Sequence, residues 1–257
     1  NEAIRDINSL MASSIKHILF DLGGTLMHAI NDSADIYLRA DEALVNKLSE
    51  YDIQLDAKKF RARLNEYYSQ REKDFHETTY HFVLRELLKE LEYAEVAESV
   101  IRSGLDAMYA VTQTNWQLEK DTIETLRSLK SRQYHLGIFS NAGDDKDVQQ
   151  LVQNFGIREY FDFVLTSAAC FYRKPHVRAF EIALAQWNIT PNECVMIGDS
   201  LVADIYGAKK LEMKAIWLTR RATFTVDDMH RFKPDFSIRT LSELLPTLDL
   251  INMKRMM

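Results

Sequence analysis

The sequence predicts a doubly wound α/β fold, in which helices flank a parallel β-sheet and an all-helical segment is inserted. Short apolar runs end abruptly in polar residues at several places along the chain, which is typical of the buried strands of a parallel sheet. Residues 31–118, in contrast, contain one glycine, Gly104, and no proline, a composition suited to uninterrupted helices. These two observations predict both the fold class and the insertion.

The first expected strand is Ile18–Phe20, which lies in the segment KHILFDLGGT, residues 16–25. Its apolar run stops at Asp21, and the pair Gly23-Gly24 then predicts a tight turn. Open parallel sheets bind ligands at the carboxyl ends of their strands. We therefore expect the Asp21 carboxylate to face an active site.

The segment 31–118 is expected to form four or five helices. Asp56 is a candidate N-cap for one of them. Apolar residues recur at helical spacing in three groups: Phe60, Leu64, Tyr67 and Tyr68; Leu84, Leu87, Leu88 and Leu91; Val96, Val100, Leu105 and Met108. The first strand must join a sheet formed by later strands, because an isolated strand cannot satisfy its own backbone. The chain therefore divides into an α/β core, residues 1–30 and 119–257, and an inserted helical module, residues 31–118.

Helices and strands alternate from about Glu119 onward. Helices are indicated first by Ile123, Leu126 and Leu129, and later by apolar residues from Ala179 to Trp187. The expected strands of this part are Leu136–Phe139, Phe163–Leu165, Val195–Ile197, Ala215–Leu218 and Phe236–Ile238.

The charge distribution favours small-molecule chemistry. The chain has a net charge of -6, and residues 31–118 hold 11 Lys and Arg against 17 Asp and Glu. Neither residues 31–118 nor the rest of the chain shows the basic stripe of a protein that binds nucleic acid or an anionic membrane. No apolar run is long enough to cross a bilayer. We therefore expect neither a nucleic-acid nor a membrane partner, and the sequence leaves the oligomeric state open.

Cysteine usage favours a reducing compartment. Cys170 and Cys194 both lie beside apolar segments, so the simplest interpretation makes them small core residues rather than a disulfide framework or catalytic thiols. The N-terminal stretch is polar and mixed in charge, without the apolar core of a secretory signal. A cytoplasmic location is the expectation.

Polar groups that could bind a phosphate follow four of the expected strands or loops. They are Asp21 with Thr25, Ser140 with Asn141, Lys174 before Pro175, and Asp199 with Asp204. Three carboxylates would repel a phosphate dianion, so a divalent cation and Lys174 are needed to offset them. Oxygen ligands without a His/Cys cluster indicate Mg²⁺ rather than zinc. The hydroxyls of Thr25 and Ser140, with turn amides, can donate to phosphate oxygens.

These segments, taken in order, resemble the four motifs of the haloacid dehalogenase-like (HAD) superfamily of hydrolases. The matching segments are DLGGT at 21–25, FSNA at 139–142, RKP at 173–175 and GDSLVAD at 198–204. The resemblance covers the α/β part and implies a Rossmann-like core. The insertion between the first two motifs resembles the helical cap of the first type (C1) in that family.

The resemblance also implies roles for individual residues. Asp21 would be the nucleophile that forms an aspartyl-phosphate, and Lys174 would neutralise charge and orient Asp21. Magnesium would be held by Asp21, the Gly23 carbonyl and Asp199, with Asp204 in or near the shell. The transferring phosphoryl group would be bound by Thr25 and Ser140, with Gly24 and Asn141 beside them.

One position departs from the family pattern. Phosphatases of the family carry a second aspartate two residues after the nucleophile, as general acid and base, where this chain has Gly23. Loss of such a group typically costs about 10²–10⁴-fold in rate. The dehalogenases of the family carry an aromatic residue there, and its C–P-cleaving phosphonatases carry a small one.

Three functions therefore stay open. The first is a magnesium-dependent phosphatase for a small phosphorylated metabolite. The second is a catalytically weak or silent protein that binds a phosphorylated ligand or a protein partner, as Gly23 favours. The third is a phosphonatase-like hydrolase, which would need a Schiff-base lysine in the cap. The candidate lysines are Lys47, Lys58, Lys59, Lys73 and Lys89.

Other residues near these motifs have a functional and a structural interpretation. His28 could serve as a substitute acid, although a satisfied loop histidine is the simpler interpretation. Residues 70–76 form a polar interruption between two helical patterns, so Arg71–His76 is either a substrate-contacting loop or a solvated connection. Four aromatic residues of the insertion are most simply core residues: Tyr67, Tyr68, Tyr80 and Trp116.

Overall fold

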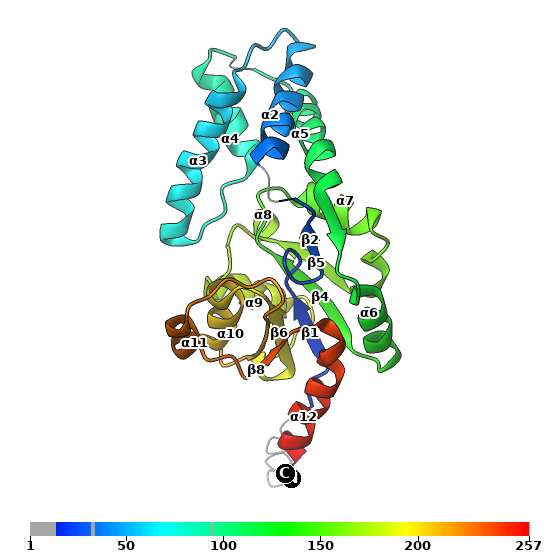
Figure 1. The fold of residues 1–257 in the computed structure, drawn as a ribbon. Helices are drawn as coiled ribbons and strands as arrows, with labels where there is room; N and C mark the ends of the chain where they lie inside the picture. Colours follow the sequence, from blue (N-terminus) through cyan, green and yellow to red (C-terminus); the bar gives the residue numbers. More distant parts are fainter. Residues whose placement is uncertain (1–13, 32–33, 94, 257) are drawn as a thin grey trace.

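The computed structural model describes residues 14–31, 34–93 and 95–256 (Figure 1). Its centre is a six-stranded parallel sheet with the strand order β5-β4-β1-β6-β7-β8. The strands are β1 (His17–Phe20), β4 (His135–Ser140), β5 (Phe163–Thr166), β6 (Cys194–Gly198), β7 (Lys214–Leu218) and β8 (Phe236–Ile238). The predicted α/β fold class is confirmed, and each expected strand is present.

Helices cover both faces of this sheet, because successive residues of each strand point to opposite faces. Ile18 and Phe20 belong to one buried cluster and Leu19 to the other. The first face packs against α6 (Thr122–Ser131), α7 (Asp145–Asn154) and α12 (Leu244–Met256). The second packs against α9 (Val177–Ala185), the helical segment Leu201–Tyr206, α10 (Gly207–Lys209) and α11 (Val226–Phe232) (Figure 1). Cys170 and Cys194 are buried in the second cluster, as predicted.

Shorter helical elements complete the core. They are α8 (Ser167–Cys170) and the single turns Gln113–Asn115, Arg158–Tyr160, Pro191–Glu193 and Leu241–Glu243.

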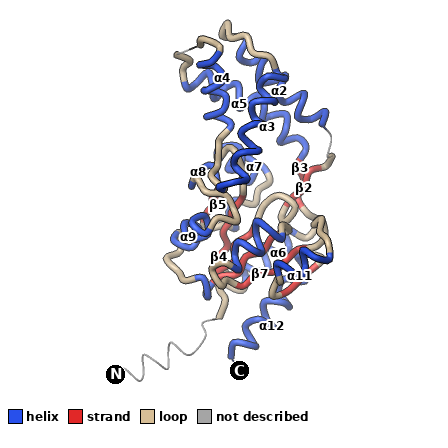
Figure 2. Tube along the Cα trace, turned by 90° about the vertical axis from the view of Figure 1, so that its left-hand side faces the viewer, coloured by secondary structure: helices blue, strands red, loops and turns tan. Residues whose placement is uncertain are grey.

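The inserted helices form a bundle at one end of the sheet (Figures 1 and 2). They are α2 (Ala34–Ser49), α3 (Ala57–Asp74), α4 (Tyr80–Glu90) and α5 (Glu98–Thr112), called the helical module below. The module has its own core, which includes Phe60, Leu64, Leu84, Leu88 and Leu105. Asp56 caps α3 by accepting a hydrogen bond from the Lys59 amide at 2.8 Å, as predicted. None of the described helices, in the module or the core, combines the length and apolar character needed to span a bilayer.

Two short strands that the sequence analysis did not predict flank the helical module. Strand β2 (Met27–Ala29) pairs antiparallel with β3 (Trp116–Leu118), so the two ends of the insertion are held side by side between the module and the sheet (Figure 2). This pairing brings Trp116 close to the first motif. The division of the chain at residues 30 and 119 stays a prediction.

The polar segment after α3 is more ordered than its composition predicts. Helix α3 continues to Asp74, so Arg71 lies in its last turn rather than in a loop. The residues between α3 and α4 are fixed to loops of the core by three backbone hydrogen bonds. Glu77 donates to the Phe171 carbonyl at 2.8 Å, Arg173 donates to Phe75 at 2.8 Å, and Tyr80 donates to Gly143 at 3.0 Å. The segment is therefore part of a fixed junction between the module and the core.

Candidate active site

The three predicted aspartates meet at the carboxyl edge of the sheet. Asp21 follows β1 and Asp199 follows β6, the neighbouring strand, and the Asp21 amide donates to the Ile197 carbonyl at 2.8 Å. Asp204 lies in the helical segment that follows. One carboxylate oxygen of each lies within 4.8 Å of the other two. All three line a cavity of about 330 Å³, called the aspartate cavity below.

Lys174 lies between two of these carboxylates. Its Nζ is 2.6 Å from Asp21 Oδ1 and 2.7 Å from Asp204 Oδ1, and it donates to the Phe139 carbonyl at 2.7 Å. Burial of this ammonium group acts to lower the pKa of Lys174, but the two carboxylates outweigh burial and raise that pKa. The lysine is therefore held protonated beside Asp21.

Asn141 fixes the loop that carries this lysine. Its Oδ1 accepts from the Lys174 amide at 2.8 Å, and its Nδ2 donates to the Lys174 carbonyl at 2.9 Å. Both Asn141 and its neighbour Ser140, at the end of β4, line the aspartate cavity. The hydrogen bonds make Asn141 a positioning residue for Lys174, and phosphate binding by Ser140 and Asn141 stays a prediction.

The carboxylates of this site fit a bound cation. Asp204 already uses both oxygens, because Lys174 contacts Oδ1 and the Ser200 amide donates to Oδ2 at 3.0 Å. Burial and the charges of Asp21 and Asp204 raise the pKa of Asp199 to about 7. Burial likewise raises the pKa of Asp204 to about 6. Three carboxylates against one lysine leave an excess of negative charge, and an all-oxygen donor set fits a hard divalent cation such as Mg²⁺.

The turn after Asp21 depends on Gly24. Its φ is +80°, its amide donates to the Met27 carbonyl at 2.7 Å, and a Cβ at this position would clash with Asp199 Oδ2. Gly24 thus permits the close approach of Asp199, and its amide is engaged within the turn. Thr25 is buried, and its Oγ1 has no hydrogen-bond partner among the described residues. Neither residue lines the aspartate cavity, so phosphate binding by Gly24 and Thr25 stays a prediction.

Trp116 covers the position where the side chain of residue 23 is missing. A Cβ on Gly23 would lie 3.2 Å from Trp116 Cη2, and Gly23 does not have a positive φ. The indole also lines both this cavity and the next one described below. Trp116 packs against the buried cluster on the first face of the sheet, as predicted, and strand β3 also places it at the site.

The His28 ring contacts residues that line neither cavity. Its Nδ1 lies 2.8 Å from Glu119 Oε1, and its Nε2 lies 2.7 Å from Gln117 Nε2. His28 is absent from the described lining of both cavities. His28 lies on strand β2 rather than in a loop, and its contacts give no support to a role as substitute acid.

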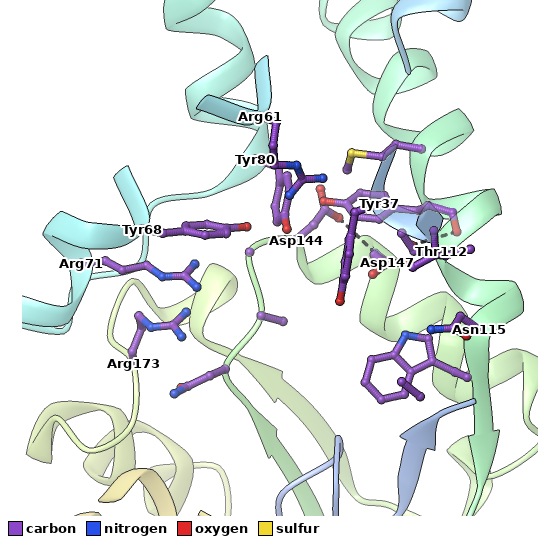
Figure 3. A pocket seen from close by; sticks show the side chains of 18 residues that line it. Tyr37, Arg61, Tyr68, Arg71, Tyr80, Thr112, Asn115, Asp144, Asp147 and Arg173 are labelled. Atoms are coloured by element: carbon purple, nitrogen blue, oxygen red, sulfur yellow. Dashed lines mark hydrogen bonds between the residues drawn. The ribbon is translucent and has the colours of Figure 1, made fainter. Parts of the chain in front are cut away.

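A second cavity of about 420 Å³ lies between the helical module and the core (Figure 3). We call it the junction cavity. It shares Trp116, Asn141, Ala142 and Asp147 with the aspartate cavity. Other lining residues include Tyr37, Arg61, Tyr68, Arg71, Tyr80 and Arg173. Tyr68 and Tyr80 thus face a cavity, and Tyr80, like Tyr67, also packs against the core of the helical module.

Sequence reasoning missed several charged residues of these cavities, Arg173 and Asp147 among them. Arg173 directly precedes Lys174, so the loop that buries the lysine also places the arginine at the same edge of the sheet. That adjacency was an available signal. Asp147 lies in the first turns of α7, and no sequence pattern distinguishes it from the neighbouring acidic residues Asp144 and Asp145.

Comparison with known proteins identifies the family. The sequence model of the haloacid dehalogenase-like hydrolases matches residues 15–211, which include all four motif segments. The chain belongs to this family. Over 240 residues, this HAD-like hydrolase is 28% identical to a glyceraldehyde 3-phosphate phosphatase of Pyrococcus furiosus, covering 93% of this chain and 95% of that protein.

Solved structures agree with this assignment. A HAD phosphatase of Thermococcus onnurineus is 28% identical, with a TM-score of 0.59 and coverage of 91% of this chain and 98% of that one. A 2-haloacid dehalogenase of Pseudomonas syringae pv. Tomato DC3000 is 25% identical, with a TM-score of 0.64 and coverage of 92% and 99%. The superfamily resemblance is thereby confirmed. The C1 cap subfamily and the motif roles of this HAD-like hydrolase stay predictions.

Proposed function

We propose that this HAD-like hydrolase is a magnesium-dependent phosphatase that acts on a small phosphorylated metabolite in the cytoplasm. The contact that carries the proposal is the one between Lys174 and Asp21, with Asp199 and Asp204 beside them. A relative that aligns along nearly the whole chain is named as a phosphatase. The helical module would act as the cap that closes over the site.

In the proposed reaction, the Asp21 carboxylate attacks phosphorus and the bond from phosphorus to the leaving oxygen breaks. A water molecule then attacks the phosphorus of the aspartyl-phosphate, which releases inorganic phosphate and restores Asp21. Lys174 supplies positive charge beside Asp21 and orients it, and the Ser140 hydroxyl donates to a phosphoryl oxygen. Asp21, Asp199 and the Gly23 carbonyl would hold Mg²⁺, with Asp204 beside them. When bound, the ion supplies positive charge for the phosphoryl oxygens.

Gly23 is the reason why we expect a low rate of phosphate hydrolysis from this enzyme. The leaving oxygen needs a proton and the attacking water must lose one, and Gly23 supplies no side chain for either transfer. We therefore expect slow turnover of alkyl phosphates and faster turnover of aryl phosphates, whose leaving groups need little protonation.

A weakly active or silent phosphate-binding protein is the second candidate. It is favoured by Gly23 together with Trp116, which covers the position of the missing acid. A phosphonatase gains no support, because the candidate lysines Lys47, Lys58, Lys59, Lys73 and Lys89 are all absent from the described lining of the two cavities.

A hydrolysis screen tests the proposal. Aryl and alkyl phosphates are assayed with and without Mg²⁺, in parallel with the variant Asp21→Asn. Asp35→Asn, an exposed aspartate of the helical module, serves as the matched control. We expect slow magnesium-dependent hydrolysis that Asp21→Asn abolishes and Asp35→Asn retains. Hydrolysis that survives in purified Asp21→Asn protein would contradict the mechanism, whereas binding of phosphates without turnover would favour the second candidate.

A further inference from the structure

Two arginine side chains lie together at one end of the junction cavity (Figure 3). Arg71 comes from the last turn of α3 in the helical module, and Arg173 comes from the core loop that carries Lys174. The Arg71 guanidinium also stacks on the Tyr68 ring, with Cζ 3.5 Å from the ring centre. The pair therefore joins the two halves of the molecule at a surface that a ligand can reach.

The Glu77 carboxylate accepts hydrogen bonds from both guanidinium groups. Arg71 Nη1 donates to Glu77 Oε1 at 3.2 Å, and Arg173 Nη1 donates to Glu77 Oε2, which also accepts from the Ser167 hydroxyl. The Glu77 side chain is fully buried, whereas 16% of each arginine side chain is exposed. Each guanidinium has five N–H donors. Among the described residues, Glu77 is the only acceptor of hydrogen bonds from these two guanidinium groups, so most of their donors stay available.

The charge of this cluster is not balanced. Two guanidinium groups and one carboxylate leave one excess positive charge, and burial and the nearby Arg71 lower the pKa of Arg173. The third arginine of the cavity differs, because Arg61 has its own partner: it binds both Asp41 oxygens, at 2.8 and 2.7 Å. The unmatched charge therefore lies at Arg71 and Arg173.

Among the described residues, the acidic side chains at the other side of the cavity form no ion pair with Arg71 or Arg173. Asp144 is bound by Arg102 at 2.7 Å, and Asp147 accepts a hydrogen bond from Gln113 at 2.8 Å. The cavity joins the aspartate cavity at Trp116, Asn141, Ala142 and Asp147. A ligand with its phosphoryl group at Asp21 can therefore extend toward the two arginines.

We propose that Arg71 and Arg173 bind a carboxylate at the end of the substrate opposite its phosphoryl group, so that the substrate class is a short phosphorylated carboxylic acid. A carboxylate carries the single negative charge that the cluster lacks, and its two oxygens match the fork of a guanidinium group. The inference rests on the proposed function, since it takes the phosphoryl group to bind at Asp21.

Equilibrium binding to the Asp21→Asn protein tests the inference without requiring turnover. Calorimetry with Mg²⁺ present compares 3-phosphoglycerate with glycerol 1-phosphate, and 2-phosphoglycolate with 2-hydroxyethyl phosphate. Within each pair, a carboxylate replaces a hydroxymethyl group. We expect the acid of at least one pair to bind about 10-fold or more tightly, as expected for a charge-assisted hydrogen bond. Arg71→Gln or Arg173→Gln, added to Asp21→Asn, should bring the ratio of the affinity for the acid to the affinity for the alcohol close to one.

Lys73→Gln is the matched control, because it removes an exposed positive charge from the same helical turn. The ratio should stay unchanged in that variant. Arg173→Gln leaves Glu77 short of one partner, so folding is checked by thermal melting, and Arg71→Gln serves if Arg173→Gln does not fold.

The inference is overturned if the Asp21→Asn protein binds acid and alcohol equally in both pairs, or if neither arginine substitution changes the ratio. Wild-type protein that hydrolyses phosphates but shows no such ratio would overturn only the inference. Wild-type protein that hydrolyses none, while Asp21→Asn keeps the ratio, would overturn only the proposed function.

Discussion

Lys174 holds Asp21 through a 2.6 Å contact between residues 153 positions apart in the sequence. The same ammonium group contacts Asp204 at 2.7 Å, so one buried cation serves two carboxylates. Removing it should affect stability and activity together, because breaking a buried ion pair leaves charges without a partner.

We expect Lys174→Met to lose at least about 100-fold in the rate of phosphate hydrolysis, a loss of transition-state stabilisation of about 2.7 kcal/mol. Without Mg²⁺ at pH 8, the variant should also be less stable by about 3–5 kcal/mol. Added Mg²⁺ should recover part of that stability, since it supplies positive charge to the same carboxylates. Urea unfolding with and without Mg²⁺ measures this, and unchanged unfolding in Lys174→Met would contradict the charge assignment.

Gly23→Asp should restore part of the missing acid catalysis. Gly23 does not have a positive φ, so an aspartate causes no backbone strain there, although its Cβ would lie 3.2 Å from the Trp116 ring and the ring must shift slightly. We expect hydrolysis of alkyl phosphates to gain about 10-fold or more, whereas formation of the aspartyl-phosphate from an aryl phosphate, whose leaving group needs little protonation, should gain less.

Gly23→Ala separates the steric effect of the new side chain from its chemistry. His28→Ala should leave the rates unchanged, because the His28 ring binds Glu119 and Gln117 instead of facing the cavity. A well-folded Gly23→Asp protein without any gain on alkyl phosphates would show that another group already supplies the proton.

Asp199 and Asp204 should differ in what they contribute. Both Asp204 oxygens are engaged by Lys174 and the Ser200 amide, whereas the structure gives Asp199 the more strongly raised pKa, about 7. We expect Asp199→Asn to abolish measurable Mg²⁺ binding in calorimetry, and Asp204→Asn chiefly to lower the melting temperature. Equal loss of Mg²⁺ affinity in the two variants, with equal melting temperatures, would contradict this division.

Asp147 should make stability depend on pH. Burial raises the pKa of Asp147 from an ordinary value near 3.8 to about 6. The native protein therefore holds this proton more tightly than the unfolded chain, so the stability it contributes is present below about pH 4 and is lost as pH rises through 6. Asp147→Asn should be more stable than wild type at pH 8, by on the order of 2 kcal/mol.

That difference should disappear near pH 4, where both proteins carry an uncharged group at residue 147. An asparagine can still accept the hydrogen bond from Gln113. Urea unfolding of both proteins at the two pH values provides the comparison. A difference that does not change with pH would show that burial of the charge is not its cause.

Sequence reasoning placed the aspartates and Lys174 correctly at one edge of the sheet, for a physical reason. A parallel sheet brings the carboxyl ends of its strands to one edge, so Asp21, Ser140 and Asp199 are expected at that edge once three apolar runs are recognised as strands. The strand order β4-β1-β6 then makes them neighbours. The same argument extends to Lys174 through the loop after the next strand, and Asp56 was predictable because a helix cap is a local feature.

Trp116, Arg71 and Asp147 could not be placed in this way. The positions of Trp116 and Arg71 depend on how the helical module sits on the core, which is set by packing and by contacts such as the hydrogen bond from Tyr80 to Gly143. Asp147 lies on the core helix α7, where no sequence pattern distinguishes it from the neighbouring acidic residues. Strands β2 and β3 have three residues each, too few for a periodic pattern. Hydropathy alone does not show that Tyr68, Tyr80 and Trp116 line a cavity, because aromatic residues at a cavity and aromatic residues in a core have the same hydropathy pattern.

Trapping of an aspartyl-phosphate at Asp21 tests the central claim most directly. Gly23 supplies no base to activate water, so with an activated aryl phosphate the aspartyl-phosphate should form faster than it hydrolyses. Rapid mixing with p-nitrophenyl phosphate and Mg²⁺ should then release a burst of p-nitrophenol equal to the enzyme concentration. Borohydride reduction followed by peptide mass spectrometry should locate homoserine at residue 21, and Asp21→Asn should show neither signal. Steady hydrolysis without a burst and without any modification of Asp21 would contradict the account.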